Sequence, residues 1–290
     1  MSVLPVRIPQ ALSPNDLAIP AIAFNAGYLT RTFGKNVTLG VNLFDFNFFS
    51  NTNPAGSTIQ NSDGSFTCTG VDGNGYNAGV CSARHNSTLL NNWQGIAFGG
   101  GAYITAVLKF PAFTGSVAGA GWPSFWSDPI QGLASVPAFV QWQGQATGYQ
   151  HSCETDFMEF DAGVINKYGI SGHDWFGFSG SITGVSTAFP AVSTSADFSR
   201  YQTYAFLWIP ATATTKGSLT WFFNGLSVGS LTYNKIDPTA PPPPASGTTA
   251  MSIIDIRHLC LIFGSSNPLL PMTVQSCEVW QKDSSMNLVQ

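Results

Sequence analysis

The sequence predicts an all-β fold in which two antiparallel sheets pack as a sandwich. Charged residues make up only 9% of the 290 residues, whereas the chain holds 30 glycines and 18 prolines, a composition that suits short strands joined by many turns. Strand signals recur at a spacing of roughly 8 to 12 residues, which is typical of sandwiches and barrels. The sequence contains no heptad pattern of the kind that long helices require.

Three segments predict strands most clearly. Residues 102–110 combine β-branched and aromatic residues and end at Pro111, which cannot donate a ladder hydrogen bond. Residues 201–209 form a second strand of this kind. Residues 272–280 alternate apolar and polar side chains and form the last strand.

A hairpin is predicted between residues 219–223 and 226–228, because Asn224-Gly225 is the preferred two-residue type I′ turn. The proline run from Pro241 to Pro244 predicts a stiff loop. It is not interpreted as a domain linker, because strand signals of the same kind lie on both sides of it.

We expect one domain over residues 1–290, with residues 1–40 as an N-terminal extension and first strands, because all-β domains often reach this length. No run of about 18 apolar residues occurs, so no spanning helix is predicted. Prolines interrupt the apolar stretches near the amino terminus, so no signal peptide is recognisable in this chain.

Charge and composition narrow the class of partner. The net charge is -4 and the basic residues are scattered, so the chain lacks the basic stripe that binds nucleic acid. Tryptophans among polar loops suit the apolar faces of sugar rings, which favours a neutral polysaccharide as the substrate. We expect a monomer without a cofactor, and no metal site is predicted, since nothing in the pattern indicates even a structural calcium.

The five cysteines are too few to form a disulfide scaffold for a chain of this length. Cys68 and Cys81 flank a turn-rich segment and could bridge two strands of a hairpin. Buried free thiols are the equal alternative.

The candidate catalytic residues lie in a segment that is rich in carboxylates. Only three glutamates occur in the chain, and two of them, Glu154 and Glu159, lie with Asp156 in one six-residue stretch. Buried carboxylates are costly unless they are paired or used. This spacing would arise by chance roughly 0.04 times per chain.

Strand alternation then predicts a local irregularity. In a regular strand Glu154 and Asp156 share one face, but Glu159 falls in phase with the apolar side chains. One extra residue at Phe157 or Met158, forming a β-bulge, returns Glu159 to the face of Glu154. We therefore predict a bulge at this point.

With the bulge, the two glutamates lie about four strand steps apart, or roughly 13 Å between Cα atoms. Side chains that lean together would bring the carboxyl groups to roughly 5 Å, the separation of a retaining glycosidase. Glu154 would be the nucleophile and Glu159 the acid and base. Asp156 would assist by sharing a hydrogen bond with Glu154 and helping to keep Glu159 protonated.

The stretch Glu154-Thr155-Asp156-Phe157-Met158-Glu159 resembles the E-x-D-x-x-E signature of glycoside hydrolase family 16, in its bulged, laminarinase-like branch. Other segments resemble the family in the same order. They are residues 100–111, the Trp motif at 121–126, and the later strands at 204–210, 221–225 and 271–280, which together cover nearly the whole chain.

The resemblance implies a concanavalin A-like β-jelly roll and endo-cleavage with retention, most directly of a β-1,3- or β-1,3(4)-glucan, in an extracellular or periplasmic setting. It also implies substrate contacts from Trp122, Trp126, His173 and Trp175. Each has a plainer interpretation, since a sandwich tryptophan can be core and a histidine can be an ordinary surface residue. Two alternatives remain open, a lectin-like jelly roll without turnover and a transglycosylase that uses the same residues.

Overall fold

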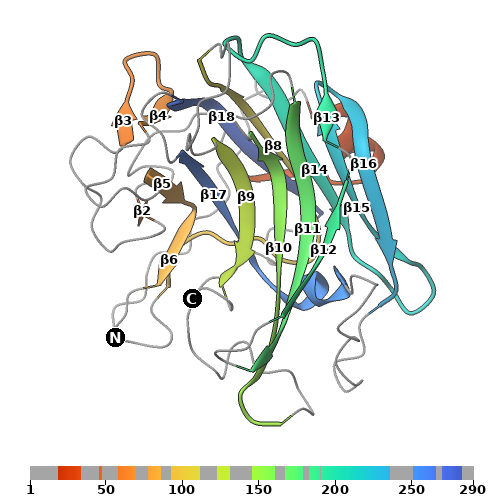
Figure 1. Cartoon of the computed structure of the whole chain (residues 1–290). Coiled ribbons are helices and arrows are strands. Elements are labelled where there is room, and N and C mark those ends of the chain that lie inside the picture. Colours follow the sequence, from red (N-terminus) through yellow and green to blue (C-terminus); the bar gives the residue numbers. More distant parts are fainter. Residues whose placement is uncertain are drawn as a thin grey trace, which may run out of the picture.

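The computed structural model is a β-jelly roll built from two antiparallel sheets that pack face to face (Figure 1). All strand pairs among the described residues are antiparallel, in agreement with the predicted fold class. The residues that the structure describes are 19–33, 46–47, 58–69, 78–85, 93–111, 123–130, 146–160, 167–178, 183–189, 191–235, 251–265 and 270–282.

Sheet A runs in the order β16-β15-β14-β8-β18-β4-β3, and β1 also pairs with β18. Its strands are β1 (Thr30–Phe33), β3 (Thr58–Gln60), β4 (Phe66–Cys68), β8 (Ala102–Lys109), β14 (Gln202–Ile209), β15 (Gly217–Phe223), β16 (Leu226–Tyr233) and β18 (Met272–Gln281). The strands that the sequence predicts at residues 102–110, 201–209 and 272–280 are therefore confirmed to within one residue.

Sheet B runs in the order β12-β11-β10-β9-β17-β5-β2, and β13 pairs with β11. Its strands are β2 (Phe46–Asn47), β5 (Ala78–Cys81), β9 (Ser124–Pro129), β10 (Tyr149–Glu159), β11 (Lys167–Phe178), β12 (Thr183–Ala188), β13 (Val192–Ser193) and β17 (Leu259–Ser265). A separate hairpin joins β6 (Ala83–His85) to β7 (Trp93–Gly95). We call the face of sheet B that points away from sheet A its outer face.

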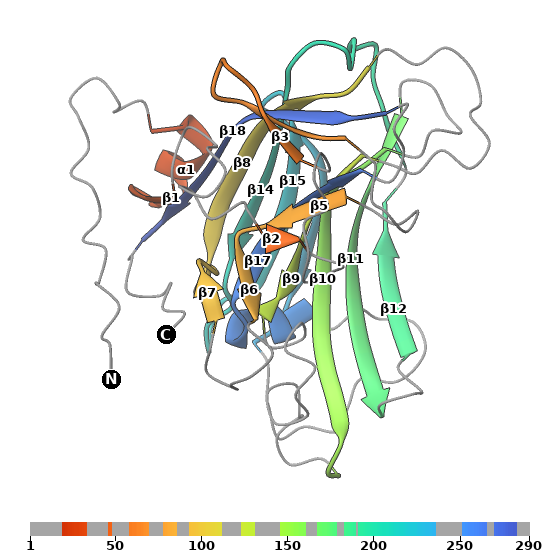
Figure 2. The same cartoon turned by 90° about the vertical axis from the view of Figure 1, so that its left-hand side faces the viewer.

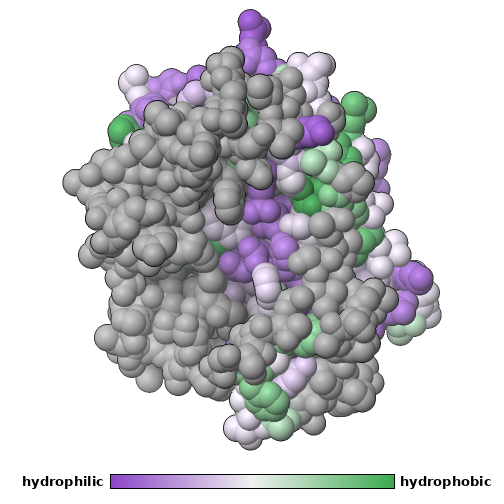
Figure 3. Space-filling view, in the orientation of Figure 1, coloured by the Kyte–Doolittle hydropathy of each residue, from purple (hydrophilic) through white to green (hydrophobic). Residues whose placement is uncertain are grey.

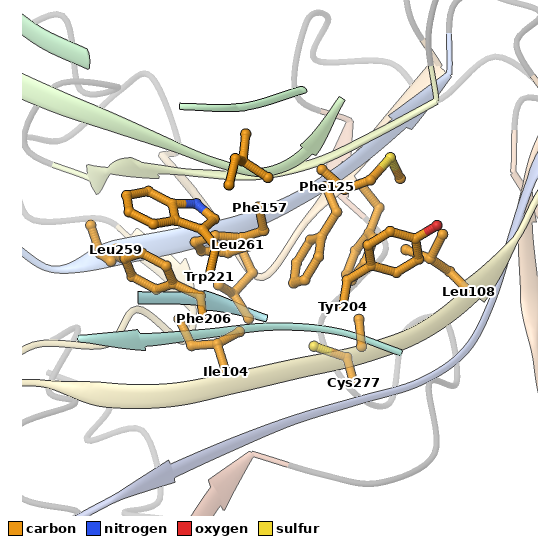
Figure 4. Close-up of a cluster of buried hydrophobic side chains, with 14 of the residues drawn as sticks. Ile104, Leu108, Phe125, Phe157, Tyr204, Phe206, Trp221, Leu259, Leu261 and Cys277 are labelled. Atoms are coloured by element: carbon orange, nitrogen blue, oxygen red, sulfur yellow. The ribbon is translucent and has the colours of Figure 1, made fainter. Parts of the chain in front are cut away.

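The core lies between the two sheets, where large aromatic side chains interdigitate (Figure 4). Phe157 of β10 contacts Phe206 of β14 with ring centroids 4.7 Å apart, and Phe206 in turn meets Trp221 of β15 at 5.1 Å. Within sheet B, Phe125 and Phe263 stack at 4.3 Å. Burying rings of this size supplies most of the hydrophobic stabilisation of a sandwich.

The predicted hairpin between β15 and β16 is confirmed. Asn224 and Gly225 both have positive φ angles, of 49° and 82°, as a type I′ turn requires. The Asn224 side chain also accepts a hydrogen bond from the Thr203 N–H at 2.9 Å, which ties the turn to the neighbouring strand. The proline run at 241–244 lies outside the described residues.

The helical segments among the described residues are short. The short helix α1 (Ala21–Asn25) and β1 lie on the side of sheet A that faces away from sheet B (Figure 2). There the Tyr28 hydroxyl donates a hydrogen bond to the Trp208 carbonyl at 2.9 Å. A 3₁₀ turn, η2 (Met251–Ile256), precedes β17. No helix among the described residues is long and apolar enough to cross a membrane.

All five cysteines are buried thiols, and none of them forms a disulfide. Cys68 lies on β4 of sheet A, whereas Cys81 lies on β5 of sheet B. The two therefore do not form the bridged hairpin that was one of the two interpretations of the sequence, and the free-thiol alternative is the one found.

Candidate active site

The acidic stretch forms the end of β10, at the centre of sheet B. Cys153 and Thr155 are fully buried on the inner face of the strand, whereas Glu154 is only partly buried and points to the outer face. Asp156 shares the face of Glu154, as strand alternation predicts. In Figure 3, hydrophilic residues gather over the middle of the side of the molecule on which β9, β10 and β11 lie.

The predicted β-bulge is present. On the β11 side, Glu154 pairs with His173, Asp156 with Ser171 and Glu159 with Gly169, and the register shifts between Asp156 and Glu159. The shift is also present on the β9 side, between Asp156 and Met158. Three steps along β10, from Asp156 to Glu159, thus match two steps along β11, from Ser171 to Gly169, as a bulge requires.

The bulge restores Glu159 to the outer face. Its partner Gly169 lies four steps from His173, the partner of Glu154, and an even number of steps means the same face. Phe157, Met158 and Phe160 are all at most 1% exposed and pack into the core, whereas Glu159 is only partly buried. The site therefore avoids a carboxylate sealed inside the sandwich.

Glu154 is held from the β11 side. The indole Nε1 of Trp175 donates a hydrogen bond to Glu154 Oε2 at 2.9 Å, and the rings of Trp175 and His173 stack with centroids 5.3 Å apart. Burial and the nearby charge of Asp156 raise the pKa of Glu154, while His173 and the Trp175 hydrogen bond oppose that rise. The ionised form of Glu154 is therefore most stable when both of these partners are in place.

Asp156 is buried and bonded to β11. Its Oδ2 accepts a short hydrogen bond from the Ser171 hydroxyl and lies 2.9 Å from Nε2 of His173. Burial lowers the pKa of His173, but the hydrogen bond and charge of Asp156, with the charges of Glu154 and Glu159, raise it overall. The imidazole is therefore drawn toward its cationic form beside the three carboxylates.

The predicted aromatic contacts separate into three groups. Trp175 and His173 are partly exposed on the outer face beside Glu154. Trp126 lies on β9, paired with Asp156 in the register, and is 8% exposed. Trp122 lies outside the described residues.

A buried polar pair lies behind the site, on the inner face of β10 and β11. Nε2 of His151 is bonded to Oδ1 of Asp174, and both side chains are fully buried. Nη2 of Arg257 donates a hydrogen bond to the His151 carbonyl at 2.8 Å. These contacts fix β10 against β11 and against the residues that precede β17.

Sequence reasoning missed two residues of the site, Ser171 and Asp128. Ser171 is paired with Asp156 only through the β10–β11 register, which no local pattern encodes. Asp128 has a local signal, since it stands two residues after Trp126 on the same face of β9. No group of three or more histidine, cysteine, aspartate or glutamate side chains in the described part of the chain could hold a metal ion.

The chain resembles several carbohydrate-active proteins in structure, although no protein-family model and no curated protein matches it. The endo-1,3-β-glucanase of Streptomyces sioyaensis is 21% identical over 72% of this chain and 77% of that chain, with a TM-score of 0.41. The κ-carrageenase of Pseudoalteromonas carrageenovora is 12% identical over 95% of this chain and 99% of that chain, with a TM-score of 0.46.

A sugar-binding domain is also among the similar structures. The carbohydrate recognition domain of Emp47p is 7% identical over 82% of this chain and 94% of that chain, with a TM-score of 0.39. Identities and TM-scores at this level assign neither a family nor an activity to the chain. Those have to come from the side chains of the site.

Proposed function

We propose that this protein is a retaining endo-glycosidase that cleaves a neutral polysaccharide, most directly a β-1,3- or β-1,3(4)-glucan, by double displacement. The observation that carries the proposal is the β-bulge between Asp156 and Glu159. It returns Glu159 to the outer face that Glu154 and Asp156 share, and a purely binding protein does not need three carboxylates there.

In the first step, Glu154 attacks the anomeric carbon and forms a glycosyl ester. The bond to the leaving oxygen breaks as Glu159 delivers its proton to that oxygen. Trp175 and His173 support this role of Glu154, because a donated hydrogen bond and the charge of a protonated imidazole favour its ionised form. Both partners also fix the direction in which the carboxylate points.

In the second step, Glu159 accepts a proton from water while the water oxygen attacks the anomeric carbon and releases Glu154. The sugar thus keeps its original anomeric configuration. Asp156 would assist by holding His173 beside Glu154 through its 2.9 Å contact. A sugar hydroxyl in place of water would give transglycosylation with the same residues.

The substrate and mechanism are tested with a panel of β-1,3-, mixed-linkage and β-1,4-glucans, agar and carrageenan. We expect the wild type to release oligosaccharides of mixed length from a β-1,3-containing glucan, and the first anomer seen by proton NMR to be β. Glu154→Gln and Glu159→Gln should each lose at least about a thousandfold in kcat/KM. Glu278→Gln is the matched control, because Glu278 is the third glutamate and lies on β18 of sheet A.

Azide separates the two glutamate roles. With Glu154→Ala, azide should fill the space of the lost nucleophile and yield the α-glycosyl azide, whereas with Glu159→Ala it should attack the glycosyl ester and yield the β-azide. A wild type that binds glucans without releasing product would instead support a lectin-like protein. A polymeric substrate also implies an extracellular or periplasmic location, which fractionation of the source cells would check.

A further inference from the structure

A fourth carboxyl group lies next to the proposed nucleophile. The register of β9 and β10 pairs Thr155 with Ser127, and their hydroxyls meet on the inner face at 2.5 Å. One step further along β9, Asp128 points to the outer face, on the side of Glu154 that faces β17. Glu154 therefore has His173 on one side and Asp128 on the other.

The two sides of Glu154 differ in charge. From β11, the Trp175 N–H and the imidazole of His173 approach its carboxylate. From β17, Cys260 pairs with Asp128 in the register, and the Cys260 sulfur accepts a hydrogen bond from the Ala83 N–H at 3.3 Å. An indole N–H donor and an imidazole whose pKa is raised thus lie on one side of Glu154, whereas the Cys260 thiol lies on the side of Asp128.

Among the described residues, the side chain of Trp126 donates a hydrogen bond to Asp128. The described groups whose charges raise its pKa are Glu154 and Asp156 on β10 and Cys260 on β17. His258, just before β17, is drawn to its neutral form because burial lowers its pKa. Burial and the three acidic neighbours together raise the pKa of Asp128 well above its ordinary value, and the Trp126 hydrogen bond opposes this.

We propose that Asp128 is a positioning residue for Glu154: it keeps its proton while Glu154 gives up its own, so that the pair carries one negative charge and that charge stays on the nucleophile. This inference rests on the proposed glycosidase function. Two carboxyl groups this close cannot both ionise cheaply, and the unequal surroundings decide which one does. A neutral Asp128 also keeps an acceptor oxygen for the Trp126 indole.

Infrared spectroscopy of the full chain in deuterated buffer tests directly whether Asp128 is protonated, because protonated carboxylic acids have their own C=O stretching band. At neutral pH, Asp128→Asn should lower the intensity of this band by one carboxyl group. Asp197→Asn, which changes an exposed carboxylate whose pKa is lowered by its Ser199 hydrogen bonds, is the matched control and should leave the band unchanged. An Asp128→Asn spectrum identical to that of the wild type overturns the proposal.

Glu154→Gln tests whether the charge of Glu154 is what holds the proton on Asp128. Without that charge Asp128 should ionise more easily, so its midpoint in the infrared titration should fall by at least about one pH unit. An unchanged midpoint overturns the proposal. These measurements need no substrate, so they remain decisive even if the chain cleaves no polysaccharide.

Kinetics test the role of Asp128 in the reaction. Asp128→Asn is neutral and keeps an acceptor for Trp126, so its kcat/KM should stay within about threefold of the wild type. Asp128→Leu is also neutral but has no acceptor for Trp126, and it should be impaired. A loss of more than about tenfold in Asp128→Asn would overturn the proposal, because it would mean that the reaction needs Asp128 as an anion.

Discussion

The indole Nε1 of Trp221, on β15 of sheet A, donates a hydrogen bond to the backbone carbonyl of Asp156, on β10 of sheet B, at 2.8 Å. This contact crosses the core at the point where the β-bulge begins. A bulge disturbs the ladder locally and leaves backbone groups in need of other partners. Trp221 supplies one such partner from the opposite sheet, and so connects the core to the geometry of the site.

Trp221→Phe should therefore affect both stability and the proposed activity. The variant keeps an aromatic ring but leaves the Asp156 carbonyl without its donor, which should lower the free energy of unfolding by about 1 to 3 kcal/mol. We also expect a lower kcat at little changed KM, because the bulge places Glu159. Urea unfolding and steady-state kinetics measure the two effects.

Trp280→Phe is the control for that variant. It removes the 3.0 Å hydrogen bond from Trp280 to Glu278 on β18, away from the site. A fall in kcat for Trp280→Phe as large as that for Trp221→Phe would argue against a specific link to the bulge.

Trp175→Phe should shift the acidic limb of the pH profile. The Trp175 hydrogen bond stabilises the ionised form of Glu154 and opposes the rise of its pKa. Its removal should raise that pKa further, so kcat/KM should begin to fall at a pH about 0.5 to 1 unit higher than in the wild type. A limb that stays in place would show that Trp175 does not set the ionisation of the nucleophile.

Asp156→Asn should lower the pKa of His173, because the hydrogen bond and charge of Asp156 raise it. Proton–nitrogen NMR of the imidazole measures this shift, and His258 serves as the internal control. Since the folded-state pKa of His173 is raised, its pairing stabilises the fold fully below the unfolded value of about 6.5 and less as the pH rises through the folded value. The stability difference between wild type and Asp156→Asn should shrink accordingly with rising pH.

Deletion of Met158 and insertion of one alanine after it should have opposite consequences. The deletion removes the extra residue of the bulge, so Glu159 can still pair with Gly169 on the outer face. We expect a fold destabilised by about 2 to 4 kcal/mol, through loss of a fully buried side chain, with measurable activity. The insertion lets a regular strand form that moves Glu159 two steps further from Glu154, so hydrolysis should be lost. Equal activity of the two variants would contradict this account.

Much of the fold follows from local patterns in the sequence. The alternation at residues 102–110 and 272–280 and the Asn224-Gly225 turn each identify an element by themselves, because strand period and turn chemistry are local properties. The bulge was predictable for a similar reason. Regular alternation from Glu154 to Phe160 cannot place the carboxylates on one face and the apolar side chains on the other. One extra residue in this stretch makes both placements possible.

The rest of the site depends on which strands lie side by side. Neither the pairing of Asp156 with Ser171 nor the position of Asp128 beside Glu154 can be read from a segment alone, because both depend on the register between strands distant in sequence. The cysteines illustrate the same limit. Cys68 and Cys81 are close in sequence, yet the chain passes from one sheet to the other between them.

The bulge also separates two quantities that a protein engineer would wish to vary independently. Substitutions at Phe157 and Met158 alter how tightly the core is packed, whereas the distance between the two glutamates is set by the number of β11 steps between their partners, His173 and Gly169. Substitutions at these two positions should therefore change the stability of the fold without changing the catalytic step. To change the distance between the two acids, the number of strand steps between them would have to change, as it does when a residue is inserted.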